Sequence, residues 1–254
     1  MLADLALIPP DLSTGFALLL VAVSFLTSAL TAGLGIGGGV ALLAVMAYGM
    51  PVAALIPVHG VVQIGSNLGR FVVQRAHVDW RAIGYFVIGA VVGAMLGGRF
   101  VVALPEAWLG LMLGGFVLVM TWVKIPKLAV ASPLSFTGGG LVGSFLTMFF
   151  GATGPFVAAV FGAAFPERLT LVATHAAAMV IQHGLKVIVF GLLGFAFTPY
   201  LALLAAMIAT GFLGTLAGTA LLKRLPEARF RTGFKIVLTL LALDLIRRGL
   251  IGLF

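Results

Sequence analysis

The feature that most constrains this chain is a duplication, because polar residues recur inside two apolar stretches at one fixed offset. With an offset of 116 positions, the pairs are Gly35 and Gly151, His59 and His175, Asn67 and His183, and Arg70 and Lys186. After a five-residue insertion the offset becomes 121, and it pairs Gly93 and Gly97 with Gly214 and Gly218. A repeat of this kind is typical of transporters built from two homologous halves, and it predicts a site where the halves meet.

The apolar content places the chain in a lipid bilayer. Hydrophobic residues make up 62% of the 254 residues, whereas Asp, Glu, Lys and Arg make up only 9%, against about 25% in soluble domains. Several apolar runs are long enough to cross the membrane. There is no Cys, which excludes disulfides and thiolate chemistry. The net charge of +8 lies mostly in connections, so it does not indicate nucleic-acid binding.

The apolar runs predict an all-α polytopic membrane protein with two repeats, 1–127 and 128–254. Each repeat is expected to start with a glycine-broken hairpin and to continue with three spanning helices. In the first repeat the hairpin is 13–48 and the spans are 51–73, 82–102 and 107–123. In the second repeat the hairpin is 134–165 and the spans are 169–193, 199–222 and 230–246. The short second arms, 39–48 and 156–165, would each be about 15 Å long, half of the hydrocarbon thickness.

The basic connections favour inverted-topology repeats. Arg75 and Arg81 follow the first span of the first repeat, whereas the basic loop of the second repeat, 223–231, comes one span later. Because Lys and Arg mark cytoplasmic loops, this shift is expected if the two repeats cross the membrane in opposite directions. Arg247 and Arg248 would then lie outside, which disagrees with the rule. The alternative is eight simple spans with a cytoplasmic C-terminus, and it places loop 223–231 outside instead.

Each repeat carries one polar stripe on an otherwise apolar helix. At 100° per residue, the first stripe covers about 100° of the helix surface, and it comprises His59, Gln63, Ser66, Asn67 and Arg70. The second stripe comprises His175, Gln182, His183 and Lys186, with Met179 in place of the first Gln. A charged residue at the bilayer centre costs about 2.5–3.5 kcal/mol, so such side chains face a cavity or a partner. The alternatives are that Arg70 or Lys186 extends to the interface and that each His is a neutral structural bond between helices.

The sign of these side chains favours an anion over a cation or a metal. The apolar segments hold Arg, Lys, His, Asn and Gln, but their only carboxylate is Asp244, for which we predict an ion pair with Arg247 three residues later. The other carboxylates considered lie in connections, at Asp79, Glu106, Glu167 and Glu227. Metal sites of hard cations need acidic oxygens, whereas hydrogen-bond donors suit an oxyanion. We therefore predict no metal and no cofactor.

The glycine clusters would add backbone donors to this inventory. Each cluster precedes a short helix, and a helix N-terminus presents free N–H groups and positive dipole to an oxyanion. The predicted contributors are Gly37, Gly38 and Gly39 in the first repeat and Thr153 and Gly154 in the second. Pro155 fits the first turn of the helix that follows. Tight helix packing is the alternative reason for such clusters.

At these residues the chain resembles the TauE/SafE family of membrane proteins, also described as sulfite exporters. The resemblance covers nearly the whole length and rests on three stretches: 33–39, 57–70 with its Pro57-Val58-His59 and Ser66-Asn67, and 151–186 with its Thr174-His175 and Lys186. It implies transport of sulfite, thiosulfate or a sulfonate across a bacterial inner membrane. The second repeat departs from the first at Met179 and His183, so the site need not be symmetric.

These observations predict a secondary transporter that exports a small sulfur-containing oxyanion by alternating access, with proton coupling through His. A passive anion channel and a membrane subunit of a larger complex are the alternatives. An enzyme is not expected, since the apolar segments offer few general bases or nucleophiles. The chain has no GxxxxGK[ST] motif for ATP. The expected partners are the anion, the bilayer and, as an open alternative to a monomer, a second copy in a homodimer.

Overall fold

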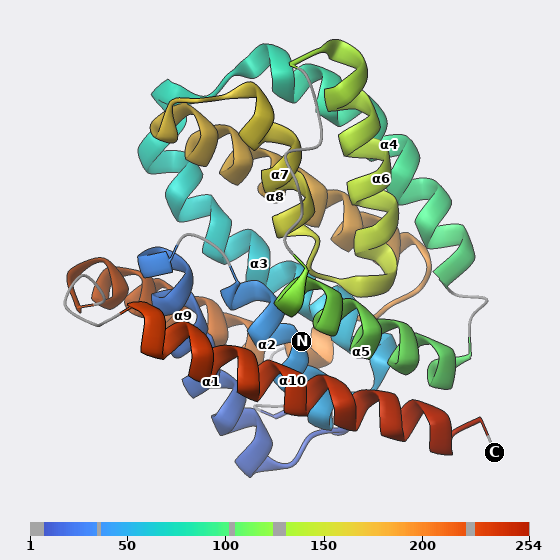
Figure 1. The fold of residues 1–254 in the computed structure, drawn as a ribbon. Coiled ribbons are helices and arrows are strands. Elements are labelled where there is room, and N and C mark those ends of the chain that lie inside the picture. The colour runs from blue at the N-terminus through green and yellow to red at the C-terminus, as the bar shows by residue number, and fades with distance from the viewer. Residues whose placement is uncertain (1–7, 35–36, 102–104, 124–130, 222–226, 254) are drawn as a thin grey trace. The chain divides into compact units, whose positions relative to one another are not determined.

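The computed structural model describes residues 8–34, 37–101, 105–123, 131–221 and 227–253 (Figure 1). This part of the chain is helical and has no strand, with 87% of the structure in helix. The predicted all-α class is therefore confirmed. Gly35 and Ile36 of the first glycine cluster, the connector 124–130 and much of the basic loop 223–231 lie outside the described residues.

The helices form two compact units, and each unit takes helices from both predicted repeats. The first unit covers Met1–Val62, Leu104–Val123 and Ala196–Phe254, and the second covers Gln63–Ala103 and Lys124–Phe195. In the first unit lie α1 (Thr14–Leu34), α2 (Gly38–Gly49), α5 (Glu106–Trp122), α9 (Leu201–Leu221) and α10 (Glu227–Ile251). In the second lie α4 (Trp80–Val101), α6 (Pro133–Phe150), α7 (Gly154–Ala164) and α8 (Arg168–Leu192). Helix α3 (Val52–Gln74) starts in the first unit and ends in the second.

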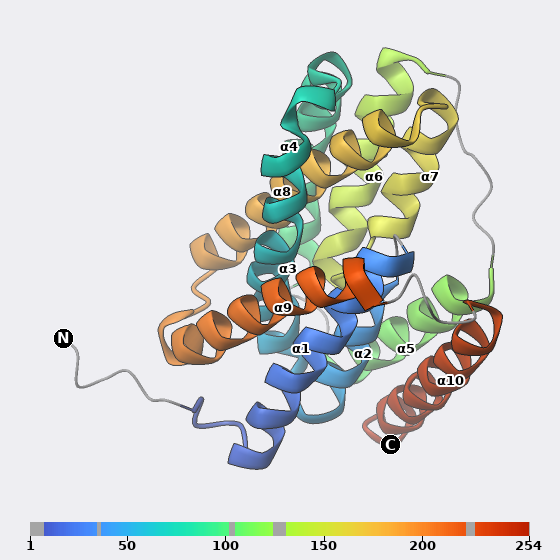
Figure 2. The same cartoon turned by 90° about the vertical axis from the view of Figure 1, so that its left-hand side faces the viewer.

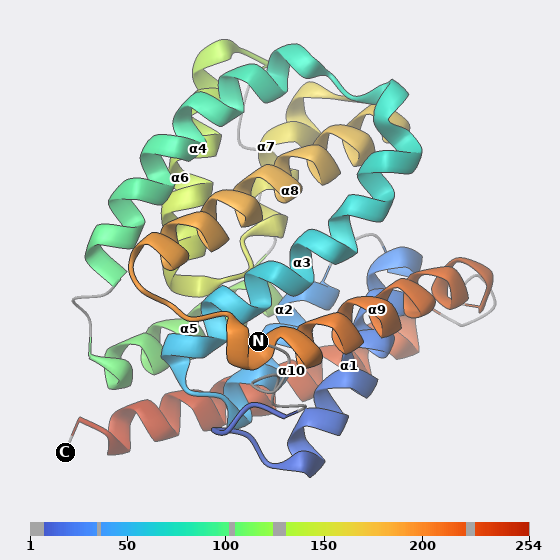
Figure 3. The same ribbon diagram turned by 180° about the vertical axis from the view of Figure 1, so that it is seen from behind.

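The second unit is built around helices α4 and α6, which lie side by side (Figures 1 and 3). Glycines let them approach backbone to backbone: a Cβ at Gly93 would collide with the carbonyl oxygen of Leu141, and one at Gly140 with that of Phe86. Such small-residue contacts are a main way in which helices associate in lipid. The core beside this pair includes the Phe86 and Phe161 rings, with centroids 5.6 Å apart.

The first unit pairs α1 with α9 and α5 with α10 (Figure 2). Here a Cβ at Gly214 would collide with the carbonyl oxygen of Phe25, and one at Gly218 with that of Ala29. Two hydroxyls add bonds between α1 and α9, because Ser24 Oγ donates to the Met207 carbonyl at 2.7 Å and Thr210 Oγ1 donates to the Val21 carbonyl at 3.0 Å.

The contacts of the matched glycines agree with the sequence register. Gly93 meets Leu141, and its counterpart Gly214 meets Phe25, which precedes Leu141 by the same offset of 116. Thus the fourth helix of each predicted repeat packs on the first helix of the other repeat. Because each pairing is internal to one compact unit, the repeat along the chain and the unit in space are different divisions of the same molecule.

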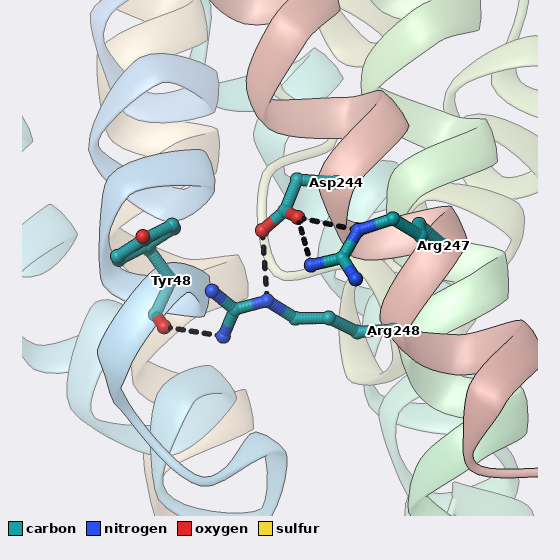
Figure 4. A network of polar contacts seen from close by, with 4 residues as sticks. All are labelled: Tyr48, Asp244, Arg247 and Arg248. Carbon is teal, nitrogen blue, oxygen red and sulfur yellow. Dashed lines mark hydrogen bonds and ion pairs between the residues drawn. The ribbon is translucent and has the colours of Figure 1, made fainter.

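An ion-pair network joins α10 to the end of α2 in the first unit (Figure 4). Asp244 accepts from Arg247 at 2.7 Å, which confirms the predicted local pair, and it also accepts from Arg248 Nε at 2.7 Å. Arg248 in turn donates to the carbonyl oxygen of Tyr48 at 2.9 Å and lies 4.4 Å from the centre of its ring. This arginine satisfies a carbonyl in the last turn of α2, where helices leave such groups without intrahelical partners.

Five helical segments are long and apolar enough to cross a membrane. They are Thr14–Ala32, Trp80–Val101, Pro133–Phe150, Arg168–Leu192 and Thr198–Gly218. Two shorter apolar helices, Gly38–Gly49 and Ala107–Trp122, accompany them among the described residues. The glycine-broken elements thus each combine a first helix of spanning length with a short second helix, as predicted. Whether those elements re-enter the membrane, and whether the repeats are inverted, stay predictions.

Candidate functional site

The break between α6 and α7 is the centre of the candidate site in the second unit. Helix α6 ends at Phe150 and is capped by Gly151, whose φ of 71° is a conformation that glycine adopts without strain. Helix α7 starts three residues later at Gly154, with Thr153 at its N-cap and Pro155 in its first turn. The proline therefore lies where the sequence analysis placed it, because its fixed φ suits the start of a helix.

Three side chains of α8 donate hydrogen bonds to this break, one after another. His175 Nε2 bonds the carbonyl oxygen of Gly154 at 3.0 Å, Gln182 Nε2 bonds Thr153 Oγ1 at 2.5 Å, and Lys186 Nζ bonds the carbonyl oxygen of Gly151 at 3.0 Å. A carbonyl oxygen can only accept, so the His175 bond requires a proton on Nε2. The helical pattern of backbone hydrogen bonds is interrupted between α6 and α7. Side chains of α8 therefore supply donors to the groups of the break.

The residues around the break are almost entirely removed from solvent. Thr153, Gln182 and Lys186 are each 0% exposed and His183 is 2% exposed, whereas His175 is half-buried. Lys186 is therefore not a side chain that extends to the interface. Its ammonium is held inside the unit by a neutral carbonyl at the C-terminal end of α6, where the helix dipole is negative.

The other glycine cluster shows a simpler version of the same arrangement in the first unit. Gly37 caps α2 with a φ of 106°, and a Cβ at Gly38 would collide with the Thr27 carbonyl oxygen. His59, which is 0% exposed, bonds the carbonyl oxygen of Gly39 through Nε2 at 3.0 Å. Both matched histidines therefore bond a carbonyl in the first turn of the short helix before their own, which is the interhelical bond that the structural alternative expected.

The rest of the first stripe lies on the second-unit part of α3. Asn67 donates to the Gln63 carbonyl at 2.7 Å and accepts from Arg70 at 2.9 Å, so these bonds stay within α3. Asn67 is buried, whereas Gln63, Ser66 and Arg70 are half-buried. Arg70 and His175 belong to the same compact unit. The second unit therefore brings together polar residues from both predicted repeats.

Arg70 and Lys186 form no salt bridge with a described acidic residue. The salt bridges that the described residues make all involve Asp244 of the first unit. Asp79 and Glu167 lie at the starts of α4 and α8, as expected for connections. No cluster of His, Asp and Glu in the described part could hold a metal ion. The second unit thus holds Arg70 and Lys186 with hydrogen-bond donors around them, a set that suits an anion.

Sequence reasoning missed some residues that complete the break. Thr147 Oγ1 donates to the Gly151 carbonyl at 3.1 Å, and Thr153 Oγ1 donates to the Gly143 carbonyl at 3.2 Å. Ser144, 0% exposed, lies beside them in sequence. Thr147 had a signal, since it is the 116-offset counterpart of Thr31. Ser144 had the same signal, since it is the 116-offset counterpart of Ser28, whereas Gly143 had none, because an apolar helix offers no pattern that separates such a glycine from an ordinary packing position.

Comparison with known proteins agrees with the resemblance seen in the sequence. The chain matches the family described as sulfite exporter TauE/SafE over residues 20–245. No curated protein and no solved structure matches it. The match covers both glycine clusters, both stripes, four of the five helical segments of spanning length and most of the first, as expected for a membrane transporter of this family. The chain therefore belongs to the TauE/SafE family of sulfite exporters.

Proposed function

We propose that this chain is a secondary carrier that exports a small sulfur-containing oxyanion, such as sulfite, thiosulfate or a sulfonate. We place the anion at the break between α6 and α7, beside α8. The observation that carries the proposal is Lys186, a fully buried cation whose hydrogen bond goes to a neutral carbonyl. Removing a lysine from water is costly unless a negative group compensates it, and a transported anion would be that group.

The residues near Lys186 give the anion further donors. Arg70 belongs to the same compact unit as Lys186, and the first turn of α7 begins at Gly154. A helix start offers backbone N–H groups and positive dipole. In the state described, His175 and Gln182 donate to the break itself. An arriving anion would compete for these donors, and that competition would couple binding to rearrangement of the break.

Proton coupling through His175 is part of the proposal. An imidazole that donates through Nε2 keeps Nδ1 as an acceptor that can take up a proton. Alternating access would then come from movement of one repeat against the other. Gln63, Ser66, Asn67 and His183 of the second unit would line the path in the alternating states, and His59 with Gly37, Gly38 and Gly39 would have the matched role in the first unit.

The test is counterflow in proteoliposomes loaded with unlabelled sulfite and supplied with labelled sulfite outside. We expect saturable exchange that is stimulated by internal sulfite or thiosulfate and not by chloride or acetate. Arg70→Ala and His175→Ala should each lower the rate at least tenfold, the equivalent of about 1.4 kcal/mol. The matched control is Arg99→Ala, because Arg99 is exposed near the end of α4 and should change the rate less than twofold.

Other outcomes would separate the alternatives. Flux that neither saturates nor responds to internal substrate would indicate a channel. An inactive pure protein that regains transport with a copurifying partner would indicate a subunit. Full transport by both Arg70→Ala and His175→Ala, in protein that still folds, would contradict the charge argument.

A further inference from the structure

We infer that the Lys186 ammonium is a built-in cation that occupies, at the end of α6, the position a co-transported metal ion would otherwise hold. Transport by this chain would then need no sodium ion at the break. The inference deepens the proposed function because it excludes sodium as the coupling ion. Only the statement about transport rests on the proposed function, whereas the statement about the Lys186 position does not.

The end of α6 is a place where a cation is expected. The last carbonyls of a helix lack intrahelical partners and carry the negative end of the dipole. At this end the Gly151 carbonyl oxygen accepts from Lys186 Nζ at 3.0 Å and from Thr147 Oγ1 at 3.1 Å. In transporters with broken helices, such carbonyl ends coordinate the coupling cation. Here a side chain of the protein already lies on that carbonyl.

The ammonium and a metal ion exclude each other at this position. Both would use the same carbonyl lone pairs, and two positive charges a few ångströms apart repel each other strongly in a poorly solvated interior. Lys186 is 0% exposed, and the salt bridges of the described residues all lie at Asp244. No described acidic side chain is paired with Lys186, so an added cation would find no carboxylate at this point to offset it.

The position in α8 explains why the ammonium could serve both the break and the anion. Gln182 and Lys186 lie one turn apart on α8 and bond Thr153 and Gly151, on either side of the gap between α6 and α7. The ammonium therefore lies at the negative end of α6, on a carbonyl three residues before α7 starts. Together with Gln182, the ammonium bonds both sides of the break without a bound ion, and its charge would offset an anion near α7.

The first test needs no transport and uses purified protein. Lys186→Ala removes the ammonium and leaves space for a small cation, whereas Lys186→Met fills the space with an apolar chain of similar length. We expect propylammonium chloride or sodium chloride to raise the melting temperature of Lys186→Ala by several degrees relative to choline chloride. Wild type and Lys186→Met should melt at the same temperature in all three salts.

Two results would overturn the inference. One is wild-type protein that sodium stabilises relative to choline, because the position would then not be filled. The other is a folded Lys186→Ala variant that shows no preference among the three cations. If Lys186→Ala does not fold, the wild-type measurement still decides, since it asks directly whether sodium has a place to bind.

Transport supplies an independent reading. Sulfite counterflow by wild type should differ less than twofold between sodium and choline media, and Lys186→Ala should lose at least tenfold and regain part of it with propylammonium. A wild-type requirement for sodium would overturn the inference while leaving the sulfite carrier intact. Absence of sulfite flux in wild type, beside cation rescue of the Lys186→Ala melting temperature, would refute the proposed function and leave the inference standing.

Discussion

The two compact units share their packing and differ in their polar chemistry. In each unit a pair of long helices is brought together by glycines at matched positions, Gly93 on α4 and Gly214 on α9. In each, a histidine bonds the first turn of a short helix. Only at α7, among the described bonds of the two glycine clusters, do an amide and an ammonium join the histidine. The two copies of a repeat can therefore keep the same helix packing while the additional polar side-chain bonds are made in only one of them.

The largest effect is expected where the two units are alike. Gly93→Leu and Gly214→Leu should each prevent folding, because the new side chain would enter the backbone of the facing helix. Overpacking of a core costs about 1–3 kcal/mol and more when backbone must move. The measurement is the yield of monodisperse protein in detergent. Gly84→Leu is the control on the same helix as Gly93, since a side chain at Gly84 meets nothing within 4 Å.

If Gly93→Leu were lost and Gly214→Leu were tolerated, the packing of the two units would not be equivalent. If both variants folded with normal yield, the result would contradict the close approach of α4 to α6 and of α9 to α1.

An intermediate effect is expected where the units differ. Gln182→Met should lower sulfite counterflow at least tenfold and change the free energy of unfolding by less than about 1 kcal/mol. Stability should change little because the lost bond to Thr153 is offset by removal of Gln182 Oε1, a buried acceptor without a partner among the described residues. Its 116-offset counterpart, Ser66, is half-buried on α3. Ser66→Ala should lower the rate by a smaller factor than Gln182→Met.

A larger loss of transport in Ser66→Ala than in Gln182→Met would reverse the assignment and place the main polar site on α3. Both the transport rate and the free energy of unfolding must be measured, because a purely structural role of Gln182 would lower the stability of Gln182→Met.

The smallest effect is expected at the hydroxyls between α1 and α9. Ser24→Ala and Thr210→Ala should each destabilise by about 0.6 kcal/mol, the mean for side-chain hydrogen bonds between membrane helices. The counterparts in the other pair, Gly140 and Gly89, have no hydroxyl and contact the facing backbone directly. Thermal unfolding of the single and double variants measures the effect. A combined loss above about 3 kcal/mol would mean that α1 and α9 depend on these bonds rather than on glycine packing.

The sequence by itself determined the class, the register and the chemical character of this protein. Apolar runs with few charges can be stable only as helices in lipid, because the backbone must bond internally there. The fixed offset identified Gly93 with Gly214 and His59 with His175, and their contacts are of the same kind. The sequence also predicted two local features that the structure confirms: Pro155 lies in the first turn of α7, and Asp244 pairs with Arg247.

Only the tertiary structure decided which helices pack together and what the polar residues bond. Periodicity gives the face of a helix and not its partner, so the sequence did not show that α4 lies on α6 and α1 on α9. It placed Arg70 and Lys186 at matched positions, yet Arg70 bonds Asn67 on its own helix and Lys186 bonds Gly151 on another. The difference arises because a buried donor takes the nearest unsatisfied acceptor, and that acceptor is set by where the neighbouring helices end.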